Sequence, residues 1–264
     1  MRKPAHFILV ISFLVALGFV LPALAITGDF VDFDCPVSGT KNKFWVAFSW
    51  GSYIYQYKSK FQLIFWPHTD KVWLYHCKKC HYTAFGEDFK EPPKAHLDAT
   101  RKLLQSVKLK FDTGDYSTIP MFERLEIAEQ IYKTWGRDDS FWCWFYRVKG
   151  YHLQKEKKQE GADAARRKAL ELAVSMMQLP GRQGERKELL LVSGAMRHYL
   201  RDDKAALADF EEALKLTLEK KGLNPEQNKN MDGYLTSVLR EYIDAIKTGK
   251  PTDDKVEQES AGLL

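Results

Sequence analysis

The chain has 264 residues and carries 40 lysines and arginines against 35 aspartates and glutamates. A balance this close to even gives no argument for nucleic-acid binding, so we expect no nucleic-acid partner. The length suits one or two domains. Four cysteines are too few for a small domain that is held together by disulfides.

The N-terminus has the three parts of a signal peptide. Arg2 and Lys3 precede an apolar run over residues 7–21, and Ala23-Leu24-Ala25 matches a cleavage site. The run is short for a membrane span, which needs about 20 apolar residues. We therefore expect cleavage after Ala25, a periplasmic or secreted protein, and no transmembrane segment in the mature chain. An uncleaved anchor is the alternative.

Residues 26–92 are predicted to form a β-rich module. Three short stretches are aromatic and β-branched: "KFWVAFSW" at 43–50, "FQLIFW" at 61–66 and "KVWLYH" at 71–76. The turn-forming "PHTD" at 67–70 separates the last two.

From residue 93 to residue 248 the apolar pattern is helical. Glycines and prolines divide the pattern into segments, and the tail over 249–264 is polar. The expected helices lie near 94–111, 119–135, 139–157, 160–178, 185–200, 203–221 and 229–247.

One helix pair has the small and aromatic residues of a tetratricopeptide repeat at the repeat's spacing: Gly194, Ala206, Phe210 and Ala213. The preceding pair matches in part, through Gly150, Ala162 and Ala169, with Arg166 in the aromatic position. A stack of ordinary α-hairpins is the alternative. Since such stacks usually bind on their concave face, we expect a protein or peptide partner there.

A Cys-x-x-Cys pair, Cys77 and Cys80, lies at the end of the β-rich region. Such a pair supplies two of the four ligands of a structural zinc site. Cys35 in "CPVSG" is the expected third ligand, and Ser38 stands where a second knuckle would have its second cysteine. The candidates for the fourth ligand are His68, His76 and His81.

Three other uses of these cysteines stay open. Cys77, Cys80 and His81 form a literal attachment motif for haem c, with His81 as the iron ligand. Oxidation would give a structural disulfide, with Cys35 as a further participant. Catalytic thiol redox chemistry is the third alternative. Cys143 in "SFWCWFYRV" is expected in the core.

The stretch from "CPVSG" to "CKKCHYTAFGEDF" resembles the bacterial family known as domain of unknown function 2225. The match covers roughly residues 34–89 well and the helices only in general character. Two residues depart from the family pattern: Ser38 replaces a cysteine and His81 replaces a glycine. The resemblance implies metal binding and no known reaction. It rests on Cys35, Pro36, Gly39, Cys77, Cys80, Tyr82, Ala84, Asp88 and Phe89.

The sequence therefore predicts an α+β protein, in which a small zinc-ribbon-like β module precedes a tetratricopeptide-like helical stack. We expect an exported binding or scaffold protein with a structural zinc ion or a disulfide, and no catalytic residues. The alternatives are a mono-haem electron-transfer protein and a thiol oxidoreductase.

Overall fold

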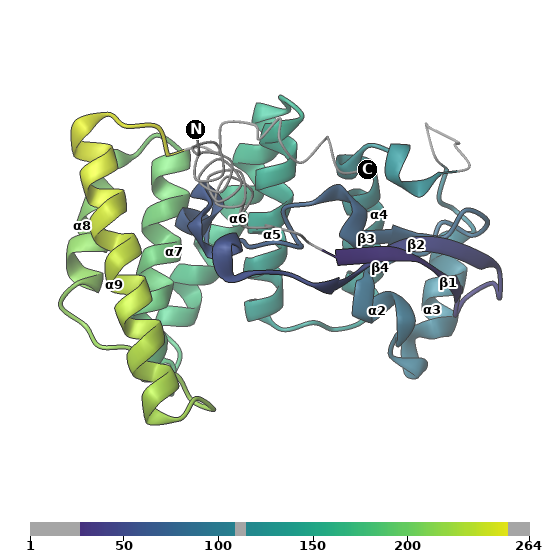
Figure 1. Cartoon of the computed structure of the whole chain (residues 1–264), viewed down its shortest axis with the longest axis horizontal. Helices are drawn as coiled ribbons and strands as arrows, with labels where there is room; N and C mark the ends of the chain where they lie inside the picture. Colours follow the sequence, from purple (N-terminus) through teal and green to yellow (C-terminus); the bar gives the residue numbers. More distant parts are fainter. Residues whose placement is uncertain (1–26, 109–114, 253–264) are drawn as a thin grey trace, which may run out of the picture.

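The computed structural model describes residues 27–108 and 115–252, and the molecule is α+β. Two β-hairpins lie at one end and the packed helices α5–α9 at the other (Figure 1). The predicted signal peptide and most of the polar tail lie outside the described residues. Within those residues, no helix has the length and apolar character to cross a membrane.

The first hairpin joins β1 (Thr27–Asp34) to β2 (Lys41–Ser49), and the second joins β3 (Leu74–His76) to β4 (Thr83–Phe85). The strand expected at 43–50 is confirmed within β2. The strand expected at 71–76 is confirmed only in its second half, because its first half is the 3₁₀ turn η3 (Lys71–Trp73).

The prediction of a strand at 61–66 is wrong. The chain forms two 3₁₀ turns there, η1 (Ser52–Gln56) and η2 (Lys58–Gln62), and then continues without regular structure. This stretch lies against helices, so its apolar side chains are buried without strand pairing.

Eight α-helices follow within the described residues. Those expected at 119–135, 139–157, 160–178, 185–200 and 229–247 are confirmed to within a few residues. The helix expected at 203–221 is shorter, and so is the described part of the one expected at 94–111. The helices are α2 (Gly86–Lys90), α3 (Leu97–Leu104), α4 (Met121–Thr134), α5 (Asp139–Lys155), α6 (Gln159–Met177), α7 (Arg186–Tyr199), α8 (Asp203–Ala213) and α9 (Pro225–Thr248), with 3₁₀ turns η4 (Lys94–His96), η5 (Tyr116–Thr118) and η6 (Gln183–Glu185).

Consecutive helices pack as pairs, α5 on α6, α6 on α7 and α7 on α8. Gly194 permits the last contact, because a Cβ atom at this position would collide with the ring of Phe210. Gly150 similarly lies against the side chain of Arg166. The small residues singled out in the sequence therefore mark places where helices come close together.

The hairpins are anchored on α4. The hydroxyl of Tyr132 accepts a hydrogen bond from the amide of Phe85 at 2.9 Å. The fully buried guanidinium of Arg124 donates to the carbonyl of Leu74 at 2.6 Å. One hydrophobic cluster runs from the hairpins into the helices, so the core is continuous across residue 92.

The stretch over 57–64 leaves the β end and lies against α7 and α9 (Figure 1). Phe61 stacks on Tyr242 with ring centroids 4.5 Å apart, and Lys60 forms an ion pair with Glu241 at 2.7 Å. The chain itself therefore covers the part of α7 and α9 that this stretch contacts.

Candidate metal centre

Each hairpin ends in a six-residue turn that begins with a cysteine. Residues 35–40 connect β1 to β2, and the pair Asp34–Lys41 closes the turn. Residues 77–82 connect β3 to β4, and the pair His76–Thr83 closes that turn. The motifs "CPVSGT" and "CKKCHY" thus have the same place in two separate hairpins.

The two turns also share their backbone hydrogen bonds. The amide of Cys35 donates to the carbonyl of Thr40 at 2.9 Å, and the amide of Gly39 donates to Cys35 at 2.8 Å. The amide of Cys77 donates to Tyr82 at 2.8 Å, and the amide of His81 donates to Cys77 at 3.0 Å. Each turn is therefore a knuckle that points the side chains of its first and fourth residues toward one place.

The fifth residue of each knuckle has a left-handed backbone, with φ of 68° at Gly39 and 64° at His81. Glycine adopts this conformation readily, whereas a residue with a side chain pays a conformational cost. His81 is thus held in the same left-handed conformation as the glycine at the matching position of the first knuckle.

The three knuckle cysteines meet between the hairpins. Their sulfur atoms all lie within 4.8 Å of one another, and those of Cys35 and Cys80 are 3.5 Å apart. Ser38, the fourth residue of the first knuckle, places its hydroxyl 3.5 Å from the sulfur of Cys77. With metal–sulfur bonds of about 2.3 Å, the edge of a tetrahedral site is about 3.8 Å. The three sulfurs therefore lie close to the spacing of ligands on one tetrahedral ion, with the hydroxyl of Ser38 beside one of them.

Hydrogen bonding within this group sets the ionisation of its thiols. The pKa of Cys77 is lowered, chiefly because Cys35 and then Cys80 donate hydrogen bonds to its sulfur. The pKa of Cys35 is raised chiefly by its hydrogen bond to Cys77, and the pKa of Cys80 is raised by its hydrogen bonds to Cys35 and then to Cys77. The site therefore stabilises a thiolate at Cys77, and a thiolate is the form that binds a metal.

Asn42 is a further part of the site that the sequence did not suggest. Its amide nitrogen lies 3.6 Å from the sulfur of Cys77, and its amide oxygen accepts from the backbone of Lys78 at 3.0 Å. The side chain is buried, although asparagine is uncommon in strands. An asparagine directly before the strand predicted at 43–50 was therefore the feature of the sequence that could have pointed to Asn42.

The three candidate histidines lie outside the sulfur group, as far as the described residues show. His68 packs edge-on against the rings of Phe85 and Trp144. His76 and His81 are paired through their ring nitrogens at 3.3 Å, and His76 is also bonded to Thr83 at 2.7 Å. Because Thr83 donates to the carbonyl of His81, it accepts from His76, which fixes the proton on Nδ1 of His76.

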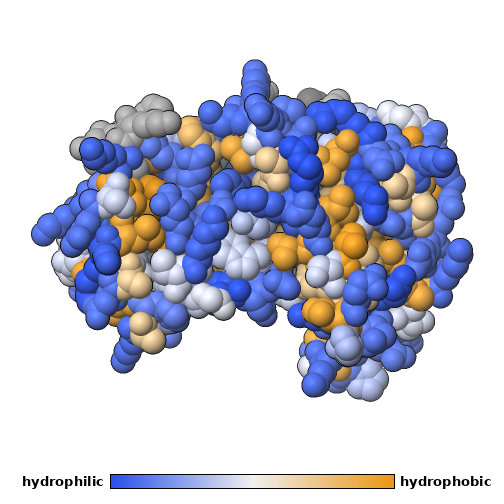
Figure 2. Space-filling view, turned by 180° about the vertical axis from the view of Figure 1, so that it is seen from behind, coloured by the Kyte–Doolittle hydropathy of each residue, from blue (hydrophilic) through white to orange (hydrophobic). Residues whose placement is uncertain are grey.

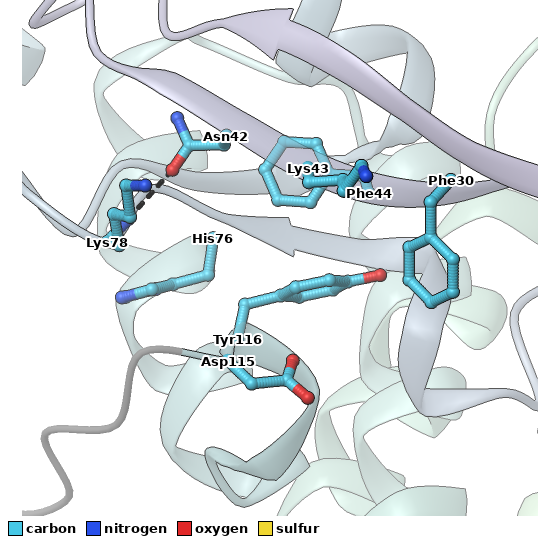
Figure 3. A pocket seen from close by; sticks show the side chains of 8 residues that line it. All are labelled: Phe30, Asn42, Lys43, Phe44, His76, Lys78, Asp115 and Tyr116. Carbon is cyan, nitrogen blue, oxygen red and sulfur yellow. Dashed lines mark hydrogen bonds between the residues drawn. The ribbon is translucent and has the colours of Figure 1, made fainter.

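A pocket of about 250 Å³ lies beside the second knuckle (Figure 3). Asn42 and Lys78 meet at one end, Phe30 lies at the other, and Tyr116 lies below Phe44 between them. His76 and Asn42 line this pocket, so it lies next to the residues that surround the sulfur group.

Cys143 lies apart from the site. Its thiol is buried in α5, where it donates to the carbonyl of Ala169 at 3.4 Å, and burial raises its pKa. The expectation that Cys143 belongs to the core is confirmed.

No family model, curated protein or solved structure matches this chain. The resemblance drawn from the two cysteine motifs therefore stays a prediction, and the geometry of the knuckles is the ground on which a function can be proposed.

Proposed function

We propose that this chain is a non-catalytic metal-binding protein in which one zinc ion joins two zinc-ribbon-like knuckles. One observation carries the proposal: two turns of equal length and equal hydrogen bonding bring three sulfurs and one hydroxyl together. Thiolates are ligands that zinc prefers, whereas a serine hydroxyl is a weak one. We expect Cys35, Cys77 and Cys80 to hold the ion, with Ser38 beside the fourth position.

The ion would serve the structure of the β region. Cys35 and Cys77 are buried, and each hairpin has only two strands. Such a hairpin has little stability alone, so a shared ion would stabilise both. Three cysteine sulfurs would surround the ion, and the hydroxyl of Ser38 would lie at the fourth position.

We further propose that the protein is exported and acts as a binding or scaffold protein. The signal-peptide pattern of residues 1–25 supports export, and the paired helices with small residues at their contacts support a tetratricopeptide-like stack. A protein or peptide partner would bind the stack outside the surface that residues 57–64 cover.

Haem and a disulfide are weaker alternatives for the same residues. Cys77 is fully buried and its sulfur lies beside Ser38 and Asn42, which leaves no open path to a haem vinyl group. The sulfurs of Cys35 and Cys80 are 3.5 Å apart, whereas a disulfide bond is about 2.05 Å long. A small movement under oxidising conditions would close that bond.

Elemental analysis of the purified mature chain tests the proposal. We expect about one zinc per chain from the four-ligand site, loss of that zinc in Cys35→Ala, and a lower melting temperature after chelation. Cys143→Ala is the matched control, because it removes a buried cysteine outside the site and should keep the zinc.

Three results would contradict zinc. A Soret band in the absence of zinc would assign the motif to haem. A metal-free chain with two fewer titratable thiols would assign it to a disulfide. Unchanged zinc content in Cys35→Ala would exclude the first knuckle from the site.

A further inference from the structure

A second pocket, of about 660 Å³, lies in the helical part of the molecule, away from the knuckles. Ser140, Cys143 and Arg147 of α5 line it, together with Leu189 and Val192 of α7. The loops before α7 and before α9 form its rim. Its size falls in the range of small-molecule sites, about 300–1,000 Å³.

Arg147 is a buried cation in this pocket without a carboxylate partner. Its side chain is 8% exposed, and its guanidinium donates to the backbone carbonyls of Cys143, Gln62 and Leu63. Across residues 27–108 and 115–252, no carboxylate forms an ion pair with it. Buried charges in proteins are ordinarily paired, so this guanidinium lacks its usual counter-charge.

The acids on the pocket walls do not supply that charge, because lysine and arginine already neutralise them. Glu185 pairs with Arg182 at 2.8 Å, and Glu188 pairs with Lys220 at 2.8 Å. Lys221 adds a further positive charge at the exposed rim. The pocket is therefore electropositive, with its unpaired charge on Arg147 and Lys221.

The pocket lining also includes the apolar side chains of Met176, Leu189 and Val192. On the face shown in Figure 2, hydrophilic residues dominate and apolar residues gather mainly in an upright band on the right half. A pocket with both a buried cation and apolar side chains favours a ligand with an anionic end and an apolar body.

We propose that this pocket binds a small organic carboxylate, with the carboxylate near Arg147 and the apolar body along Met176, Leu189 and Val192. The site is independent of the cysteine knuckles, so this proposal and the zinc proposal stand or fall separately.

Calorimetric titration of the purified protein with octanoate tests the proposal, with octanamide as the uncharged ligand of the same length. We expect octanoate to bind at least about tenfold more tightly than octanamide, because a charge-assisted hydrogen bond is much stronger than a neutral one. Added salt should weaken the binding of octanoate but not that of octanamide.

Two variants locate the site. Arg147→Gln should weaken octanoate binding at least about tenfold and leave octanamide unchanged. Lys221→Glu should weaken octanoate about three- to tenfold through the reversed rim charge. Lys215→Glu is the matched control, because it makes the same charge change at an exposed lysine outside the pocket lining and should leave binding unchanged.

Circular dichroism shows whether Arg147→Gln is folded. If it is not, the comparison of Lys221→Glu with Lys215→Glu still tests whether the pocket binds octanoate. The proposal is overturned if octanoate does not bind, if both ligands bind equally, or if Lys215→Glu acts as strongly as Lys221→Glu. Binding of an acidic peptide without binding of octanoate would replace the small carboxylate by a peptide.

Discussion

Ser38 and Cys80 have the same position in two matching turns, and they differ in one atom. The sulfur of Cys80 lies 3.5 Å from Cys35, and the oxygen of Ser38 lies 3.5 Å from Cys77. The hydroxyl also donates to Thr40 at 3.1 Å, which ties it to the protein instead of freeing it for a metal. If the proposed site binds zinc, we expect this single position to set the strength of that binding.

Ser38→Cys should restore a four-sulfur site. Because a thiolate is a far better zinc ligand than a hydroxyl, we expect zinc binding to tighten by at least about tenfold, or roughly 1.4 kcal/mol. Competition with a metal-sensitive dye measures the change. Ser38→Ala is the control, because alanine cannot bind a metal ion. If the zinc affinity of Ser38→Ala equals that of Ser38→Cys, the side chain at position 38 has no role in the site.

The three cysteines were predictable because Cys-x-x-Cys and "CPVSG" are local patterns that share a known chemistry. The role of Ser38 at the fourth position could not be predicted, since it depends on how two distant hairpins face each other. The same holds for Asn42, which reaches Cys77 across 35 residues of chain. His68 is adjacent to the motifs in sequence, yet Phe85 and Trp144 hold its ring elsewhere.

At the scale of elements, small residues decide where helices approach. Gly194→Ala would place a methyl group in the ring of Phe210, and overpacking of this kind costs about 1–3 kcal/mol. Gly233→Ala is the matched change in α9, where no atom lies within 4 Å and alanine should add about 0.5–1 kcal/mol. Chemical denaturation measures both, and equal effects would show that α7 and α8 do not pack through Gly194.

Helices were easier to predict than the aromatic stretches. Helical periodicity and glycine breaks are local, so most helices lie within a few residues of their expected bounds. The stretch at 61–66 has the composition of a strand, but Phe61 is buried against Tyr242 on α9. The helix expected to reach residue 221 ends at Ala213, where an extended link follows and the amide of Leu218 is bonded by Asp232.

At the scale of the whole molecule, a buried histidine makes the junction between the β end and the helices sensitive to acid. His152 on α5 donates from Nε2 to the carbonyl of His68 at 2.8 Å. Burial lowers the pKa of His152 to about 3 from an ordinary value of 6.5. The folded protein therefore keeps this ring neutral, whereas the unfolded chain takes up a proton below pH 6.5.

The free energy of unfolding should fall as the pH is lowered from 6.5 toward 3, by up to about 4–5 kcal/mol from His152 alone. His152→Gln keeps a hydrogen-bond donor but cannot titrate. Urea unfolding at several pH values tests this effect. The variant should lose less stability on acidification than the wild type, and parallel pH curves would exclude His152 as the acid-sensitive group.

The stretch over 57–64 also constrains the order in which the chain can fold. The ion pair of Lys60 with Glu241 joins residues 181 positions apart in the sequence, and Phe61 stacks on Tyr242 of the same helix. During synthesis, Lys60 and Phe61 leave the ribosome long before Glu241 and Tyr242 are made. Until α9 is made, Phe61 lacks the ring on which it stacks, so the nascent chain carries an exposed aromatic side chain that a chaperone can bind.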